Sequence, residues 1–254
     1  SLMLEQCILC RTNLELEKLL ATLRQNPTLV NSALTLLDIS GNKLHKRACP
    51  ELCSLLKHAK TLNCVCLADC HMESKQVLDI LDAIIVNKSQ TGFSLDLSKN
   101  DLGPKGARDI QQLLQDRISR NSDPLMKNGI IQFLDLSDNN FGNEGLAIIC
   151  KAIAGTAIKG IKLDRNFKPS MFAKAQEAGD ALSELLLQTP SLVELSIAGD
   201  DNSYYLSKYL SPLLNAICSH PSLQYLDSQR NRVGDEGIVL MAEALKCDNS
   251  LIGF

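Results

Sequence analysis

A short apolar pattern recurs along this chain at intervals of about 30 residues. In one-letter code the pattern is L-x-x-L-x-L-x-x-N-x-L, where x is any residue. Its clearest copies are Leu34, Leu37, Ile39, Asn42 and Leu44, and then Ile131, Leu134, Leu136, Asn139 and Phe141. This periodicity constrains the fold more than any other feature, because each unit has an apolar face that only a neighbouring unit can cover.

Weaker copies of the template extend the series to about eight units. The template asparagine position is occupied in turn by Thr12, Asn42, Cys70, Asn100, Asn139, Asn166, Asp200 and Asn231. Residues 251–254 resemble the start of a further unit, and neither end has the polar covering unit that such stacks need. We therefore expect residues 1–254 to form a single repeat domain that is a fragment of a longer protein.

Each template copy is followed by a segment with the apolar periodicity of an amphipathic helix, as at Ile110, Leu113 and Leu114. Three of these segments open with the same spacing of glycines, at 103–106, 142–145 and 234–237. Glycine lets the chain turn from strand to helix at little steric cost. The sequence predicts an α/β leucine-rich-repeat solenoid, a horseshoe with parallel strands on the concave face and helices on the convex face.

The template assigns a structural role to its asparagine position. Backbone groups in the turn after each strand lack partners, and a polar side chain there can hydrogen-bond to them. The predicted ladder consists of Asn42, Cys70, Asn100, Asn139, Asn166 and Asn231. Three segments depart from the template, at 120–129, 166–169 and 200–205, and we expect exposed turns in all three.

A candidate partner-binding surface follows from the alternation of side chains along a strand. The third and fifth template positions project from the concave face, away from the leucine core. The candidate residues are Leu36, Asp38, Asp96, Phe133, Asp135, Tyr225 and Asp227. Apolar residues surrounded by acidic ones are typical of a partner site. Aspartates that only solubilise an open sheet are the alternative interpretation.

Motif searches favour binding over catalysis. The chain has no phosphate-binding loop, no dinucleotide fingerprint, no nucleophile elbow and no H-E-x-x-H zinc pair. Asp135 and Asp138 are a poor acid–base pair, since such chemistry needs a pocket that separates their pKa values. The net charge of −3 is spread along the chain and argues against nucleic acid as a partner. We expect no enzymatic activity and no cofactor.

The ten cysteines invite a metal or disulfide interpretation, which their spacing does not support. Cys7 and Cys10 form one pair, and Cys64, Cys66 and Cys70 form a trio without adjacent histidines. Two more cysteines, Cys150 and Cys218, lie in apolar helical patterns, where a thiol acts as a small hydrophobe. Reduced thiols and the absence of a membrane span or signal peptide indicate an intracellular chain.

Three segments carry a resemblance to a known family: residues 94–100 with the following G-x-x-G-A helix, residues 163–167, and residues 193–198. Unit lengths resemble the ribonuclease-inhibitor type of repeat, and residues 34–254 are similar to the repeat domain of the CARMIL family. The resemblance implies a cytoplasmic scaffold at the plasma membrane or leading edge. It also implies a protein linked to actin capping protein, with the capping-protein tail and the membrane-binding domain absent from this chain.

Two other classes of repeat protein stay open at this point. One is a GTPase activator of the Ran-activating type, although no segment here matches its functional arginine. The other is a ribonuclease-inhibitor-like or innate-immune repeat domain that captures a ligand. GTP-hydrolysis assays and partner capture discriminate these classes from a cytoskeletal scaffold.

Overall fold

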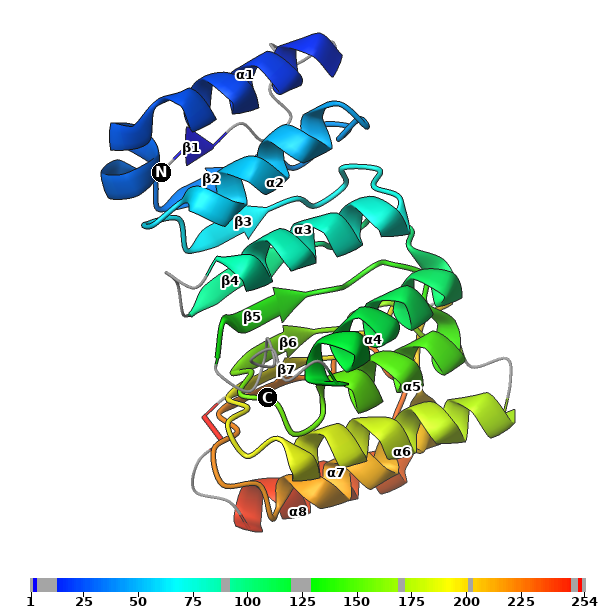
Figure 1. Ribbon diagram of the computed structural model, residues 1–254. Helices are drawn as coiled ribbons and strands as arrows, with labels where there is room; N and C mark the ends of the chain where they lie inside the picture. The colour runs from blue at the N-terminus through cyan, green and yellow to red at the C-terminus, as the bar shows by residue number, and fades with distance from the viewer. Residues whose placement is uncertain are drawn as a thin grey trace.

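The computed structural model describes residues 2–3, 13–87, 92–119, 129–168, 172–200, 203–247 and 251–252. Strands and helices alternate along these residues (Figure 1). The strands are β1 (Leu2–Met3), β2 (Leu36–Asp38), β3 (Cys64–Cys66), β4 (Phe93–Asp96), β5 (Ile131–Asp135), β6 (Gly160–Lys162), β7 (Glu194–Ser196) and β8 (Tyr225–Asp227). The α-helices are α1 (Asn13–Gln25), α2 (Ala48–His58), α3 (Ser74–Val86), α4 (Gly103–Ser119), α5 (Gly142–Ile153), α6 (Phe172–Gln188), α7 (Ser211–Ile217) and α8 (Gly234–Cys247). Two short helical turns, η2 (Leu29–Ala33) and η3 (Ser207–Leu210), precede β2 and α7.

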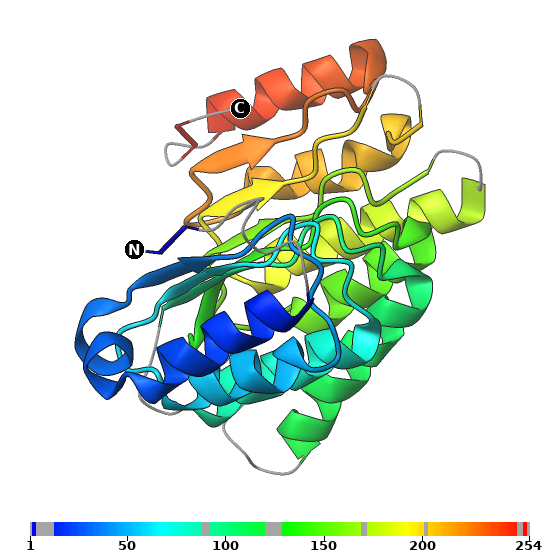
Figure 2. The same cartoon turned by 90° about the horizontal axis from the view of Figure 1, so that it is seen from above.

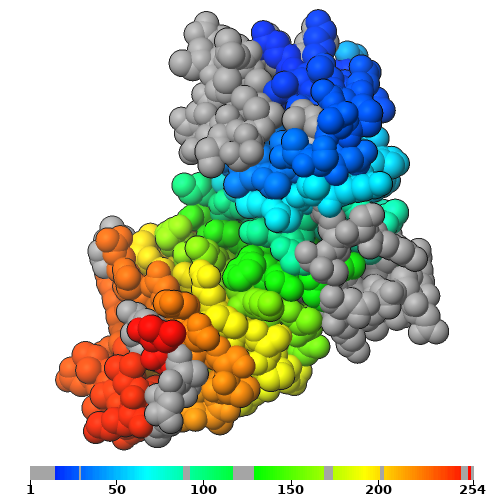
Figure 3. Space-filling view, turned by 90° about the vertical axis from the view of Figure 1, so that its left-hand side faces the viewer, coloured from blue at the N-terminus to red at the C-terminus, as the bar shows by residue number. Residues whose placement is uncertain are grey.

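The described strands form one sheet in which every neighbouring pair is parallel and the spatial order follows the chain order, β1 to β8. Parallel neighbours need a crossover connection, and the helices supply it. Strands therefore form one layer and helices the other (Figure 2). Successive units appear as successive bands of colour on the surface (Figure 3). The predicted α/β leucine-rich-repeat solenoid is confirmed.

The core lies between the two layers and is continuous from unit to unit. Template residues of the second unit, Leu34, Leu37, Ile39 and Leu44, are all buried. They meet the apolar side of the helices, represented in α2 by Leu52. Since each such side chain contributes roughly 1.5–3 kcal/mol when removed from water, the repeated leucines are the main source of stability.

Five of the side chains at the asparagine position bond to a carbonyl in the turn of the preceding unit: Cys70, Asn100, Asn139, Asn166 and Asn231. Asn139 is buried, and its Nδ2 donates to the carbonyl oxygens of Leu97 and Leu136 at 3.0 Å each. Its own N–H donates to Oδ1 of Asn166 in the next unit at 3.0 Å. Cys70 donates weakly through Sγ to the carbonyl of Ile39 at 3.4 Å. The hydrogen bonds thus run across the stack as well as within each turn.

The irregular segments only partly match the prediction of exposed turns. Asn166 and Phe167 are buried, so the prediction is wrong for these two residues. Lys168 stands where the template has an apolar residue, and Phe167, with 0% of its side chain exposed, fills the core beside it. Asp200 accepts hydrogen bonds from the backbone of Ser203 and of Tyr204. Residues 120–128, 169 and 201–202 lie outside the described part.

The described cysteines differ in how far they are buried. Burial raises the pKa of the Cys70 and Cys150 thiols to about 12 each, so both stay protonated and pack as small apolar groups. The prediction that Cys218 packs in this way is wrong, because it is exposed at the end of α7. Cys7 and Cys10 are outside the described residues. None of the helices in the described ranges combines the length and apolar character of a membrane span.

Candidate functional site

The outward-facing side of the sheet, here called the strand face, carries the third and fifth template positions of each unit. Parallel register aligns the third positions as Leu36, Cys64, Ser94, Phe133, Gly160, Glu194 and Tyr225. It aligns the fifth positions as Asp38, Cys66, Asp96, Asp135, Lys162, Ser196 and Asp227. The sequence-predicted surface residues therefore come together in two adjacent rows.

Two aromatic side chains are the large apolar groups exposed on the strand face. Phe133 has 39% of its surface exposed and Tyr225 has 49%. The four candidate aspartates and Leu36 are only partly buried. Exposed rings in a row that also carries carboxylates give the strand face both an apolar and an anionic character.

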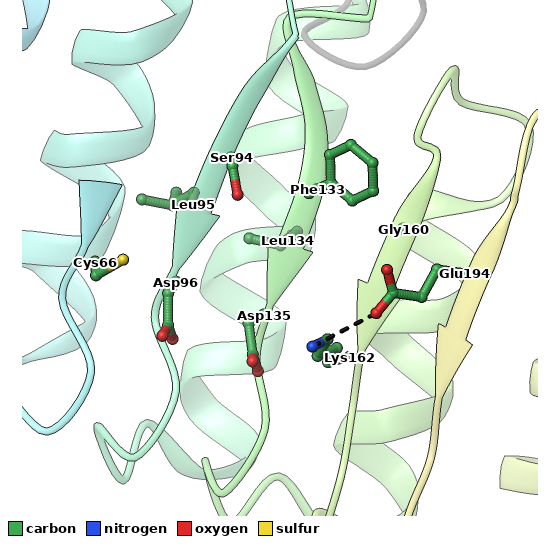
Figure 4. A pocket seen from close by; sticks show the side chains of 10 residues that line it. All are labelled: Cys66, Ser94, Leu95, Asp96, Phe133, Leu134, Asp135, Gly160, Lys162 and Glu194. Carbon is green, nitrogen blue, oxygen red and sulfur yellow. Dashed lines mark ion pairs between the residues drawn. The ribbon is translucent and has the colours of Figure 1, made fainter. Parts of the chain in front are cut away.

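A hollow of about 260 Å³ lies at the middle of the strand face. Its lining, drawn in Figure 4, consists of Cys66, Ser94, Leu95, Asp96, Phe133, Leu134, Asp135, Gly160, Lys162 and Glu194. The ring of Phe133 lies over Gly160, where an added Cβ would come within 2.5 Å of the Phe133 Cδ1. Because residue 160 has no side chain, the ring can rest against β6 and form one wall of the hollow.

The charged groups around the hollow are mainly acidic. Asp96 and Asp135 are partners in the β4–β5 register, and Figure 4 shows their carboxylates pointing the same way. Lys162 forms an ion pair with Glu194 at 3.5 Å. Burial raises the pKa of Asp135, and the charges of Asp96 and Asp164 raise it further, while hydrogen bonds from Ser137 oppose the rise. The site therefore concentrates negative charge at a cost in free energy.

The fifth-position aspartates also have a structural role that the sequence interpretation missed. Each accepts the backbone N–H two residues further on, an Asx turn that closes the bend after the strand. The donors are Ser40 to Asp38 at 2.9 Å, Ser98 to Asp96 at 2.8 Å, Ser137 to Asp135 at 2.9 Å and Gln229 to Asp227 at 3.1 Å. The repeated Asp-x-Ser at 38–40, 96–98 and 135–137 is the signal that could have revealed it.

Where a unit has no aspartate at the fifth position, the equivalent backbone N–H donates instead to a side chain of the preceding unit. The N–H of Ala68 donates to Oγ of Ser40 at 3.2 Å. The N–H of Asp164 donates to Oγ of Ser137 at 3.2 Å, and that of Ala198 to Oδ1 of Asp164 at 2.8 Å. Because Ser98 occupies the equivalent place in the unit before β5, turn closure alone does not explain the carboxylate of Asp135. The units before β4 and β8 have Ala68 and Ala198 there, which offer no side-chain acceptor, so Asp96 and Asp227 serve their own turns.

The arrangement offers binding groups rather than reaction chemistry. Asp138, once considered with Asp135 as a carboxylate pair, receives hydrogen bonds from Nε of Arg165 at 2.7 Å and from the same guanidinium at 2.5 Å. The arginine neutralises it, so the two aspartates do not share a site. Across the described ranges, His, Cys, Asp and Glu residues form no group of three or more that is suited to a metal ion.

The stacked strand–helix units and their asparagine turns define a leucine-rich-repeat domain. A family profile described as "Leucine Rich repeat" matches residues 94–110, 131–150 and 219–242. The chain is 29% identical to Protein CARMIL of Dictyostelium discoideum over 85% of this chain and 20% of that protein. It is 28% identical to mouse (Mus musculus) "Capping protein, Arp2/3 and myosin-I linker protein 2", over 81% of this chain and 15% of that protein. The chain is thus a leucine-rich-repeat domain whose sequence is similar to part of these CARMIL proteins.

A relative with a different name is also similar. Rho GTPase-activating protein gacW of Dictyostelium discoideum is 26% identical over 92% of this chain and 23% of that protein. The chain spans between 15% and 23% of the length of these three relatives. The likeness therefore concerns the repeat domain and not the remaining parts of those proteins.

Proposed function

We propose that this chain is the repeat scaffold of a CARMIL-like regulator of actin capping protein, and that its strand face binds a protein partner. The proposal rests on the partly exposed Phe133 ring beside the carboxylate of Asp135, which turn closure alone does not explain. An apolar group surrounded by polar ones, placed centrally, is the usual form of a binding hot spot. The relatives named as capping-protein linkers support the cytoskeletal assignment.

In this proposal the chain works by binding and catalyses no reaction. It serves in the cytoplasm, near the plasma membrane at the cell's leading edge, where it positions other parts of the same protein. Contact with capping protein and with the membrane is made by regions that lie outside these 254 residues. The strand face makes a separate contact with a protein partner, and this contact holds the regulator at its location in the cell.

Affinity capture from a cell extract tests the proposal. The wild-type chain is compared with a double variant, Phe133→Ala with Asp135→Asn, in which the asparagine keeps an oxygen that can accept the Ser137 N–H. Leu187→Ala is the matched control, since this exposed apolar residue lies on helix α6. We expect cytoskeletal partners to be retained by the wild type and by the control and lost from the double variant. Full retention by the double variant, with loss in the helix variant, would contradict the proposal.

A GTPase-activating role is the second candidate, because a relative carries that name. Activators of GTPases commonly supply an arginine to the transferring phosphoryl group. Arg165, in the turn after β6, is engaged by Asp138 at 2.7 Å. We expect no acceleration when the chain is added to Rho-type or Ran-type GTPases. An acceleration of about tenfold or more in GTP hydrolysis would replace the scaffold proposal.

A further inference from the structure

We infer that the hollow around Phe133 receives an arginine side chain from the partner, carried on a segment that also has apolar residues. This inference rests on the proposed function, because it names the chemistry of the partner that the strand face would bind. It follows from three features of the hollow: a ring held in place, two adjacent carboxylates, and a lysine that is already paired.

The apolar wall comes from Phe133. Gly160 leaves room for the ring to lie against β6, and the ring remains 39% exposed. A long side chain with an aliphatic stem can cover such a ring and keep its charged end in reach of polar groups. Guanidinium groups also stack on aromatic rings, which an ammonium group does less well.

The charged wall comes from Asp96 and Asp135. They are register partners on adjacent parallel strands, which lie about 4.8 Å apart. Each already accepts one backbone hydrogen bond through Oδ1, and a carboxylate has capacity for more than one donor. The five N–H donors of a guanidinium fan out in a plane, so one group can bond to both carboxylates.

The charges around the hollow favour a positively charged occupant. Its lining holds Asp96, Asp135 and Glu194 against the single cation Lys162. That ammonium group is 3.5 Å from Glu194, so part of its charge is compensated. Nearby Asp164 adds to the negative field at Asp135. An acidic or phosphorylated segment is repelled here, and a purely apolar one would desolvate carboxylates without pairing them.

The test is a titration of the isotope-labelled chain by nuclear magnetic resonance with three capped pentapeptides. They share the sequence Gly-Leu-X-Leu-Gly, where X is arginine, lysine or citrulline. Citrulline has nearly the shape of arginine but no charge. We expect the arginine peptide to shift the backbone signals of Asp96, Phe133 and Gly160. It should bind about tenfold more tightly than the citrulline peptide, with the lysine peptide between them.

Two variants and one control locate the binding. Asp135→Asn keeps an oxygen that can accept the Ser137 N–H, so the turn is preserved while the charge is lost. This variant and Phe133→Ala should each weaken the arginine peptide by several-fold to tenfold. Asp180→Asn removes an exposed carboxylate on helix α6, outside the hollow and outside the strand face, and should leave binding unchanged.

The inference is overturned if the citrulline peptide binds as well as the arginine peptide, or if Asp180→Asn weakens binding as much as Asp135→Asn. These outcomes are separate from a failure of the proposed function. Partner capture that depends on Phe133 but shows no arginine preference would leave the proposed function standing and remove the inference. An arginine-selective hollow with no captured partner would remove the proposed function and leave only the arginine preference of the hollow.

Discussion

At the scale of single residues, one aspartate meets two requirements that conflict. The carboxylate of Asp135 closes the turn after β5 by accepting the Ser137 N–H at 2.9 Å. Burial raises its pKa, so its ionised form is disfavoured in the folded chain relative to the unfolded one. A neutral side chain with an accepting oxygen would serve the turn with less electrostatic cost. Turn closure by itself therefore does not require the charge of Asp135.

The raised pKa of Asp135 leads to a prediction for the stability of the Asp135→Asn variant. Because the folded-state pKa is raised, the protonated aspartate favours folding below the unfolded-state pKa, and that contribution is lost as pH rises through the folded-state pKa. At neutral pH we expect the asparagine variant to be at least as stable as the wild type. The advantage should disappear as pH falls to about 3. Thermal melts across this range measure the effect, and a more stable wild type at neutral pH would refute it.

The asparagine ladder gives a second prediction at this scale. Asn139→Ala removes the acceptor of the buried Asn100 N–H, and it removes one of the two side-chain amide donors to each of the carbonyls of Leu97 and Leu136. Asn42→Ala removes the Nδ2 donor to the carbonyls of Ile39 and Ser40, of which the Ile39 carbonyl keeps the Cys70 Sγ and the backbone N–H of residue 42. Each substitution should lower the free energy of unfolding by roughly 1–3 kcal/mol. Urea titration gives the value for each variant. Unchanged midpoints in both would show that water replaces the side chain and that the ladder is dispensable.

At the scale of elements, the two glycines that open α5 act for different reasons. Gly142 has a φ of 69° with nothing within 4 Å of an added Cβ. Gly145 is in an ordinary helical position, but an added Cβ would lie 2.9 Å from the Phe141 Cβ and 3.2 Å from that of Ala107. One glycine is needed for its backbone conformation, and the other for the close packing of α5 against its surroundings.

Matched substitutions separate the two reasons. Gly142→Asn should be nearly neutral, because asparagine tolerates the left-handed conformation, whereas Gly142→Ala should cost about 1–2 kcal/mol. Gly145→Ala should cost about 1–3 kcal/mol through overpacking, and Gly145→Asn should cost no less. Chemical denaturation of the four variants gives the comparison. Equal losses for both residue types at position 142 would contradict the conformational argument.

Strands, turns and helix starts were predicted well wherever their sequence signal lies within a single repeat unit. A fixed spacing of leucines and asparagines indicates a strand and its turn, and the G-x-x-G spacing marks the start of a helix. The burial of Phe167 was not predicted, because it depends on Lys168 leaving a place in the core that a neighbour fills. The turn contacts from Ser40 to Ala68 also join different units, and a pattern read within one unit does not contain them.

For the whole molecule, the order of the strands follows from the repeat, since each unit can only stack on its neighbours. The two rows of the strand face were predicted for the same reason. The hollow was not, because it needs Phe133, Gly160 and the Lys162–Glu194 pair to meet from three adjacent strands. The sequence predicted which side chains face outward. It did not predict which of them lie against a glycine.

Equivalent positions on helices α5 and α8 differ in how far they are exposed to solvent. Aligning the G-x-x-G openings of α5 and α8 places Leu146 opposite Ile238 and Ile153 opposite Leu245. Leu146 and Ile153 are 0% exposed, whereas Ile238 is 59% exposed and Leu245 is 53% exposed. In α5 this side is covered within the described stack, whereas the equivalent side of α8 is open to solvent.

The same kind of truncation should therefore destabilise the chain strongly at the buried position and hardly at all at the exposed one. Leu146→Ala removes buried methyl groups and leaves a cavity, so we expect a loss of about 2–5 kcal/mol. Ile238→Ala removes side-chain atoms that already contact water, so the change should stay within about 0.5 kcal/mol. Urea denaturation at low protein concentration compares the two. A loss at Ile238 as large as that at Leu146 would mean that the open side of α8 is covered in solution. A concentration-dependent unfolding midpoint would then identify a second copy of the chain as the cover.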